Sequence, residues 1–207
     1  MAKPKNKVKF NLKNVYYAVQ NRTEDGALTY AAPKHIPGAV NINLTPQGES
    51  NTFYADGIAY YVSNANSGYH GDLEVALIPD SFAVDVLKER LDEADQVLVE
   101  RSDVETAVFA LLFQFDGDIH GVRHVLYNCT VARPNITGAT TTNTKEPQTA
   151  SMAITAAPMA DGRVKARTTA DTPDATYNGW FDAVWEPKAP EVYDAGAAEP
   201  LPSMGAA

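Results

Sequence analysis

FALLFQFDGDIHGVRHVLYNCTV, residues 109–131, is the stretch that decides the fold class of this chain. Apolar side chains occupy every second position from Phe109 to Phe115, and a second alternating run extends from Val122 to Val131. The polar sequence Asp-Gly-Asp at 116–118 separates the two runs. A period of two places alternate side chains on one face of a β-strand. The stretch therefore predicts a β-hairpin over residues 107–133.

The same alternation recurs along most of the chain and predicts further strands. They are expected at residues 8–12, 15–19, 40–44, 58–62, 73–77, 152–156 and 164–167. The first two runs share one parity after a slip, which indicates a β-bulge. The sequence ADGR at 160–163 has the composition of a turn before the last strand.

Two segments have helical spacing instead. The first is predicted to begin at Pro79 and Asp80 or Ser81 and to continue through Leu91, because its apolar residues lie on one helical face. These residues are Ala83, Val84, Leu87 and Leu91. The second is a short amphipathic helix expected to cover one end of the core. Its apolar residues are Trp180, Phe181, Val184 and Trp185. We therefore expect a mainly β fold with one flanking α-helix.

The length of 207 residues predicts one domain, which we place at 1–186 with a basic N-terminal arm at 1–9. Residues 187–207 are rich in proline and alanine and lack any periodicity. Such a sequence buries too little surface to offset its ordering entropy, so we expect a flexible C-terminal tail. No stretch is long and apolar enough for a membrane helix, and no secretory signal is present, so we expect a soluble protein without a membrane partner.

The charge of the chain argues against a nucleic-acid-binding protein. Lys and Arg number 17 against 26 Asp and Glu, a formal net charge of −9. Nucleic-acid affinity depends on neutralising phosphates with basic groups, so this chain repels DNA. That repulsion suits a conduit through which DNA slides without adhering. Basic residues gather in the N-terminal arm and nine acids lie within 80–105. Either these are two ordinary solvated faces, or the opposite charges support head-to-tail self-association.

No pattern in the sequence indicates catalysis, a cofactor or a metal. His120 and His124 have the spacing of a helical metal pair, but they fall on a predicted strand, where four residues span about 13 Å. Neither a Gly-rich phosphate loop nor a Gly-x-Ser-x-Gly elbow is present. The single cysteine, Cys129, lies in an alternating apolar run and is read as a small buried hydrophobe. We therefore do not expect an enzyme.

Long polar stretches at 45–57 and 134–149 are predicted as loops, and loops of that length usually have a role. The first carries Phe53 and Tyr54 directly before the Asp56-Gly57 turn. Either these rings fold back onto their own core, or they anchor another subunit, because exposed aromatic side chains concentrate interface energy. We assign Phe53, Tyr54, Asp56 and Gly57 to a candidate inter-subunit contact.

Several motifs in order resemble the major tail protein family of siphophages that infect Gram-positive bacteria. They are KVKFNLKNVYYAV near the start, the block FYADGIAYYVSNANSGYHGDLEVALIPDSF (53–82), FALLFQFDGD (109–118), RHVLYNCTVARP (123–134) and the ADGRVKA turn. The resemblance covers roughly residues 5–186 and leaves the C-terminal tail outside it. No single motif is diagnostic; the signal lies in their order over most of the chain.

The resemblance implies a tail tube fold, a β-sandwich or barrel flanked by a helix, and no catalytic residues. It implies homo-hexameric rings that stack into a hollow tube in the virion tail, made in the host bacterial cytoplasm. The expected partners are the tape measure, tail terminator and distal tail proteins, and DNA passes through the lumen without specific binding. Open sheet edges are consistent with this assembly, because neighbouring subunits can pair along them.

Three other readings remain open. An Ig-like adhesion or receptor-binding module has the same alternating strands but stays monomeric or trimeric and binds a cell surface. A small β-rich hydrolase has an activity that is lost when one carboxylate is replaced. Another tail component, such as a tail terminator, has a related fold but occupies one ring of the virion rather than many.

Overall fold

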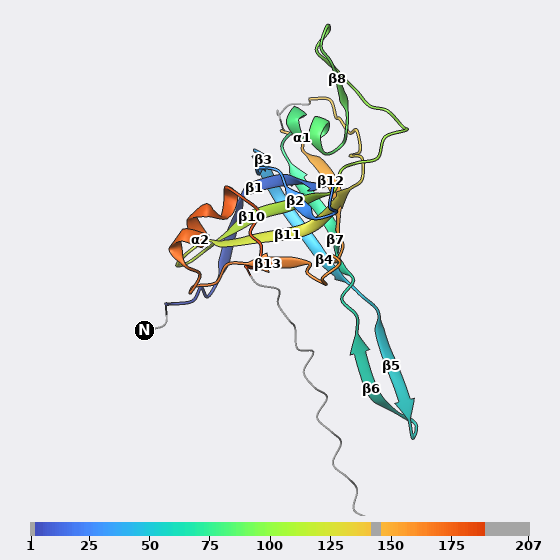
Figure 1. Cartoon of the computed structure of the whole chain (residues 1–207), viewed down its shortest axis with the longest axis vertical. Helices are drawn as coiled ribbons and strands as arrows, with labels where there is room; N and C mark the ends of the chain where they lie inside the picture. Colours follow the sequence, from blue (N-terminus) through green and yellow to red (C-terminus); the bar gives the residue numbers. More distant parts are fainter. Residues whose placement is uncertain (1–2, 142–145, 189–207) are drawn as a thin grey trace, which may run out of the picture.

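The computed structural model describes residues 3–141 and 146–188 and is mainly β, with 46% strand and 8% helix (Figure 1). The strands are β1 (Lys9–Arg22), β2 (Leu28–Tyr30), β3 (Lys34–His35), β4 (Ala39–Gln47), β5 (Ser50–Ala55), β6 (Ile58–Asn64), β7 (Gly68–Val75), β8 (Arg90–Asp92), β9 (Val97–Val99), β10 (Phe109–Gly117), β11 (Val122–Val131), β12 (Ala150–Ala156) and β13 (Lys165–Arg167). The helices are α1 (Asp80–Asp85), α2 (Asp174–Asn178) and the 3-10 turn η1 (Gly179–Phe181). Each strand predicted from alternation overlaps an observed strand, so the mainly β prediction is confirmed.

Nine strands form one antiparallel sheet with the order β2-β1-β10-β11-β12-β7-β4; β13 joins β11 and β3 joins β1. Two further hairpins, β5–β6 and β8–β9, stand apart from this sheet. β1 and β4 approach each other but are not paired, so the sheet is not closed. The barrel alternative in the predicted fold class is therefore wrong, because an unpaired edge remains at β4.

The predicted hairpin at 107–133 is confirmed as β10–β11, with Leu112 paired to Val125 and Phe115 to Val122. Its turn begins at Asp118, because Gly117 still belongs to β10. The predicted bulge in the first strand is also present. The β1–β10 register shifts twice, and Asn14 lies in the second shift with a φ of 54°.

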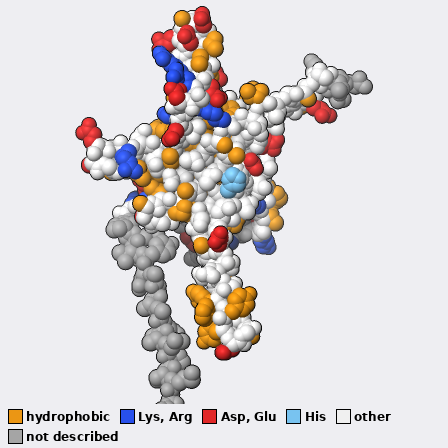
Figure 2. All heavy atoms as spheres, turned by 90° about the vertical axis from the view of Figure 1, so that its right-hand side faces the viewer, with side chains coloured by type: hydrophobic (Ala, Val, Ile, Leu, Met, Phe, Trp, Pro, Cys, Tyr) orange, Lys and Arg blue, Asp and Glu red, His pale blue; other side chains and the backbone are white. Residues whose placement is uncertain are grey.

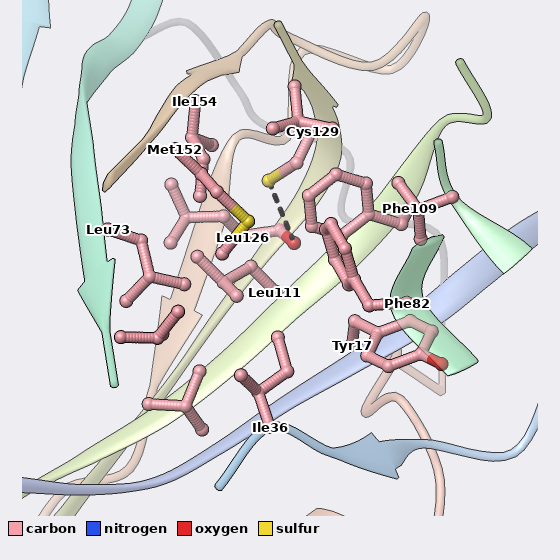
Figure 3. Close-up of a cluster of buried hydrophobic side chains, with 14 of the residues drawn as sticks. Tyr17, Ile36, Leu73, Phe82, Phe109, Leu111, Leu126, Cys129, Met152 and Ile154 are labelled. Carbon is pink, nitrogen blue, oxygen red and sulfur yellow. Dashed lines mark hydrogen bonds between the residues drawn. The ribbon is translucent and has the colours of Figure 1, made fainter. Parts of the chain in front are cut away.

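Two hydrophobic clusters lie on opposite faces of β10. The larger is enclosed by the curved sheet and α1 (Figure 3). It takes Phe109 and Leu111 from β10, while Ala110 and Leu112 belong to the smaller cluster beneath residues 180–185. Since both faces are covered, β10 is buried almost throughout.

Both predicted helices are corrected by the structure. α1 ends at Asp85 rather than Leu91, and the chain leaves it through Lys88, whose φ of 61° no helix can continue. Leu91 belongs instead to the β8–β9 hairpin, paired with Leu98. The second helix, α2, precedes the tryptophans rather than containing both of them.

The prediction that the tryptophan segment covers the core nevertheless agrees with the packing. Trp180 is buried, and its ring lies 6.0 Å from that of Trp185 in a stacked arrangement. Phe181 and Val184 pack against the same smaller cluster.

The N-terminal residues from Lys3 onward run along the β10–β11 turn. The Asn6 side chain donates to the backbone carbonyl of His120 at 2.6 Å and accepts from the amides of Ile119 and His120. Asp118 accepts from the Lys7 amide at 2.9 Å. The basic arm is therefore attached to the sheet from at least Asn6 onward. The predicted flexible tail lies outside the described residues from 189 on.

The predicted loop at 45–57 is wrong, because β4 continues to Gln47 and β5 begins at Ser50. The segment carries no strand signal in its sequence because it is polar and contains Pro46. Proline is tolerated at this position because β4 is an edge strand, in which Pro46 lies opposite Tyr69 of β7. In the second predicted loop, residues 134–141 and 146–149 have neither helix nor strand, while 142–145 are not described.

Candidate interaction surface

The β5–β6 hairpin, hereafter the arm (residues 50–64), projects from the foot of the sheet (Figure 1). It continues the β4–β7 pair, since the Ser67 amide donates to the Gln47 carbonyl and the Ala65 amide to that of Glu49. Gly48 is required at this junction: its φ is 153°, and a Cβ there would lie 1.8 Å from the Ala65 carbonyl oxygen. The arm therefore leaves the body as a paired ribbon.

A two-residue turn closes the arm. Ala55 pairs with Ile58, and the residues between them, Asp56 and Gly57, have φ values of 53° and 76°. Two successive positive φ values are typical of the type I′ turn, in which Asp-Gly is a preferred sequence. The sequence prediction of a turn at Asp56-Gly57 therefore agrees with the structure, and these two residues shape the tip.

The arm exposes large apolar side chains along its length. Their exposed fractions lie between 52% and 69%, and the residues are Phe53, Tyr54, Ile58, Tyr60, Tyr61 and Val62. Phe53 pairs directly with Tyr61 and so shares a face with it, whereas Val62 pairs with Thr52 on the other face. Figure 2 shows hydrophobic side chains on both sides of the projecting arm.

An isolated two-stranded ribbon in this state is marginally stable in water. Its backbone ladder is complete, but its side chains bury little apolar surface in their own subunit. Contiguous exposed apolar surface of this kind typically marks a protein–protein or membrane contact. The arm contains no Lys or Arg, which removes the basic residues that strengthen binding to anionic membranes. Its composition, rich in tyrosine and other aromatics, is typical of a protein interface.

Of the four candidate residues predicted from sequence, Phe53 and Tyr54 are exposed on the arm and Asp56 and Gly57 form its turn. The reading in which the rings fold back onto their own core is therefore wrong. Sequence reasoning missed Tyr60 and Tyr61, because their strand was read as an ordinary strand of the domain. The available signal was YYV at 60–62, where successive apolar residues occupy both faces of one strand.

His124 lies in the sheet rather than in a polar site. Its ring stacks on Phe113 at 5.0 Å with a 3° interplanar angle. Burial, with smaller contributions from the positive charges of Arg167, Lys165 and Lys9, lowers the pKa of His124 to about 4. Within the described residues, no three His, Cys, Asp or Glu side chains are grouped as metal ligands.

Cys129 agrees with the prediction of a small buried hydrophobe. Its thiol is fully buried in the larger cluster and donates to the Leu126 carbonyl at 3.7 Å (Figure 3). Burial raises the pKa of this thiol to about 12, so the reactive thiolate is scarce at neutral pH.

The two predicted charge patches are partly neutralised within the chain. In the basic arm, Lys3 lies 3.4 Å from Asp174. In the acidic region, Asp103 pairs with Arg101 at 2.6 Å, and Glu100 pairs with Arg133. The tip of the β8–β9 hairpin keeps acidic side chains without an ion pair to the described residues, at Asp92, Glu93 and Asp95.

Comparison with known families and proteins adds no assignment. No protein-family model matches the chain. A search of curated proteins gives no similar sequence. None of the helices in the described ranges has the length and apolar character that a bilayer crossing requires.

Proposed function

We propose that this chain is the major tail subunit of a siphophage, and that it assembles into stacked hexameric rings forming the conduit for DNA ejection. The observation that carries the proposal is the arm, whose apolar side chains are exposed on both faces. Assembly with identical copies would remove these apolar side chains from water, because each neighbour covers surface that the monomer leaves exposed.

Three other features support a structural, self-assembling protein. The sheet is open at β4, and an unpaired edge can be satisfied by a neighbouring subunit. The ordered motifs resemble the siphophage major tail protein family over roughly residues 5–186. The net charge of −9 suits a DNA conduit, and we propose that part of it lines the lumen, so that passing phosphates are repelled. A clearly positive lumen potential in a virion structure would contradict the last point.

In this assembly Phe53 and Tyr54 contact the next ring, while the tape measure, distal tail and tail terminator proteins meet the tube. The arm extends beyond its own sheet (Figure 1). In the proposed assembly this length allows it to contact a subunit of the adjacent ring. The terminator alternative differs in copy number, because a terminator forms one ring and a tube subunit forms many.

The test is negative-stain microscopy of the concentrated full-length protein beside its Phe53→Ser/Tyr54→Ser variant. We expect the parent to form hollow tubes of stacked hexameric rings. The double variant should remain folded and soluble without tubes, because truncating an interface anchor costs about 2 kcal/mol or more and the loss repeats at every copy. Ile136→Ser is the matched control, since Ile136 is fully exposed outside the arm.

Each outcome is informative. Parent protein that stays monomeric or trimeric and binds cells would favour an adhesion module. Single rings that never stack would favour a terminator. A double variant that loses several kcal/mol as a monomer would show that the two rings stabilise their own subunit.

A further inference from the structure

A groove of about 730 Å³ lies between α1 and the β8–β9 hairpin. Its lining includes Lys34, Asp80, Val84, Asp85, Leu91 and Leu98. In Figure 1 these elements lie at the top of the molecule and the arm at its foot, so groove and arm occupy opposite ends of the longest axis.

The groove has an apolar wall that the subunit leaves in water. Val84 on α1 is 37% exposed and Leu91 on β8 is 40% exposed, although both side chains are apolar. Leu98 pairs with Leu91 on the facing strand and packs partly against the larger cluster. Leu98 therefore links the larger cluster to the open groove.

The two carboxylates at the rim differ in their partners. Asp85 is occupied, since Lys34 lies 2.6 Å from it and the Tyr17 hydroxyl donates to it at 2.8 Å. Burial acts to raise the pKa of Asp85, but the hydrogen bonds from Lys34 and Tyr17 outweigh it and keep that pKa below its ordinary value. Asp80 has no ion pair within the described residues. The groove therefore offers an apolar wall and an unpaired carboxylate.

The side chains of the arm can contact both the apolar wall and the unpaired carboxylate of the groove. Tyr54, Tyr60 and Tyr61 each combine an apolar ring with a hydroxyl that can donate to a carboxylate. The arm carries no Lys or Arg, so its attraction to the groove depends on rings and hydroxyls rather than on ion pairs. Its tip is acidic at Asp56 and is repelled by Asp80, which favours entry of the strand faces rather than the turn.

We propose that the groove between α1 and the β8–β9 hairpin receives the arm of a second copy of this chain. The inference rests on the proposed function, because it supplies the contact between successive rings. Arm and groove are different surfaces, so the contact is head-to-tail. Because they lie at opposite ends of one axis, the contact does not close on itself and propagates along a tube.

Cross-linking between two single variants tests the contact. Tyr60→Cys places a thiol on the arm and Val84→Cys places one in the groove, while the buried Cys129 contributes no reactive background. After the two full-length variants are mixed and treated with a short bis-maleimide, we expect a covalent dimer at several times the yield of either variant alone. The matched control pairs Tyr60→Cys with Val8→Cys, since Val8 is 50% exposed and lies outside both surfaces.

A charge in the groove gives a second measurement. Val84→Glu should raise the concentration needed for tubes at least tenfold, because docking then buries an unpaired carboxylate, and Val8→Glu should not. If tubes form but the test and control mixtures cross-link equally, the groove does not receive the arm, and the tube proposal is unaffected. A groove-specific cross-link without tubes would support the contact and reject the tube.

Discussion

The two long hairpins, β10–β11 and β5–β6, have the same antiparallel pairing and opposite environments. Both are antiparallel and contain aromatic residues and an Asp-Gly pair, which ends β10 in the first hairpin and forms the turn in the second. Phe109 and Leu111 are completely buried, whereas the large apolar residues of the arm are at least 52% exposed. The difference lies in the neighbours, since β10 is flanked by β1 and β11 and covered on both faces, while β5 pairs only with β6. Alternation thus predicts a strand, but its burial depends on what the rest of the chain, or another chain, places over it.

The difference between the two hairpins is tested most directly by making the same substitution in each. Phe109→Ala should lower the free energy of unfolding by about 3–5 kcal/mol, because it leaves a cavity beside the Phe82 ring. Phe53→Ala should change that of the unassembled subunit by less than about 0.5 kcal/mol, as expected for an exposed side chain. Urea unfolding of dilute monomer measures both, and equal losses would contradict the contrast.

The next largest effect concerns pH and His124, on the buried hairpin. Its folded pKa of about 4 lies below the ordinary value of 6.5, so the unfolded chain binds the proton more readily. Stability contributed by the neutral ring is complete above pH 6.5 and is lost as the pH falls toward 4, by up to about 3 kcal/mol. Urea unfolding at intervals from pH 7.5 to 4 measures this slope.

Two variants make the pH prediction specific. His124→Phe keeps an aromatic ring in the stack with Phe113 and should flatten the slope in this window. Phe113→Leu disturbs the same stack without removing the titrating group, so it should lower stability and keep the slope. A slope unchanged by His124→Phe would assign the pH dependence to other groups.

The smallest effect is expected from removing the arm. Replacing residues 48–66 with a short turn should change the free energy of unfolding of the monomer by less than about 1 kcal/mol, because the arm packs on no buried cluster. The same deletion should abolish assembly, as read by microscopy. A large loss of monomer stability would show that the β4–β7 pair depends on its extension.

The parts of the fold that sequence could predict are those with a local cause. The β10–β11 hairpin has alternating apolar residues throughout, and the bulge in β1 is visible as a change of phase. The burial of Ala110 and Leu112 has no such signal, because the segment that covers them begins near Trp180. Contacts between segments so far apart in the chain produce no periodic pattern in the sequence of either segment.

The errors have local physical causes as well. Leu87 and Leu91 fit a helical face, but the left-handed conformation at Lys88 ends the helix before Leu91. The first strand of the arm was read as part of a loop because β5 is polar, although Asp56-Gly57 is a strong hairpin signal. For the candidate contact, sequence identified Phe53 and Tyr54, while Tyr60, Tyr61 and the receiving groove required the structure.

The pairing of β1 with β10 has a consequence for synthesis on the ribosome. Lys9 lies opposite Gly117, so the edge of β1 that pairs with β10 lacks its partner until more than a hundred further residues are translated, whereas β2 and β3 can pair with the other edge much earlier. At about 5–20 residues per second, that interval lasts roughly 5–20 s. Throughout it, the apolar sequence VYYAV of the nascent chain lacks its pairing to β10 and can contact chaperones and neighbouring nascent chains. We therefore expect translation speed between β1 and β10 to affect the yield of folded protein.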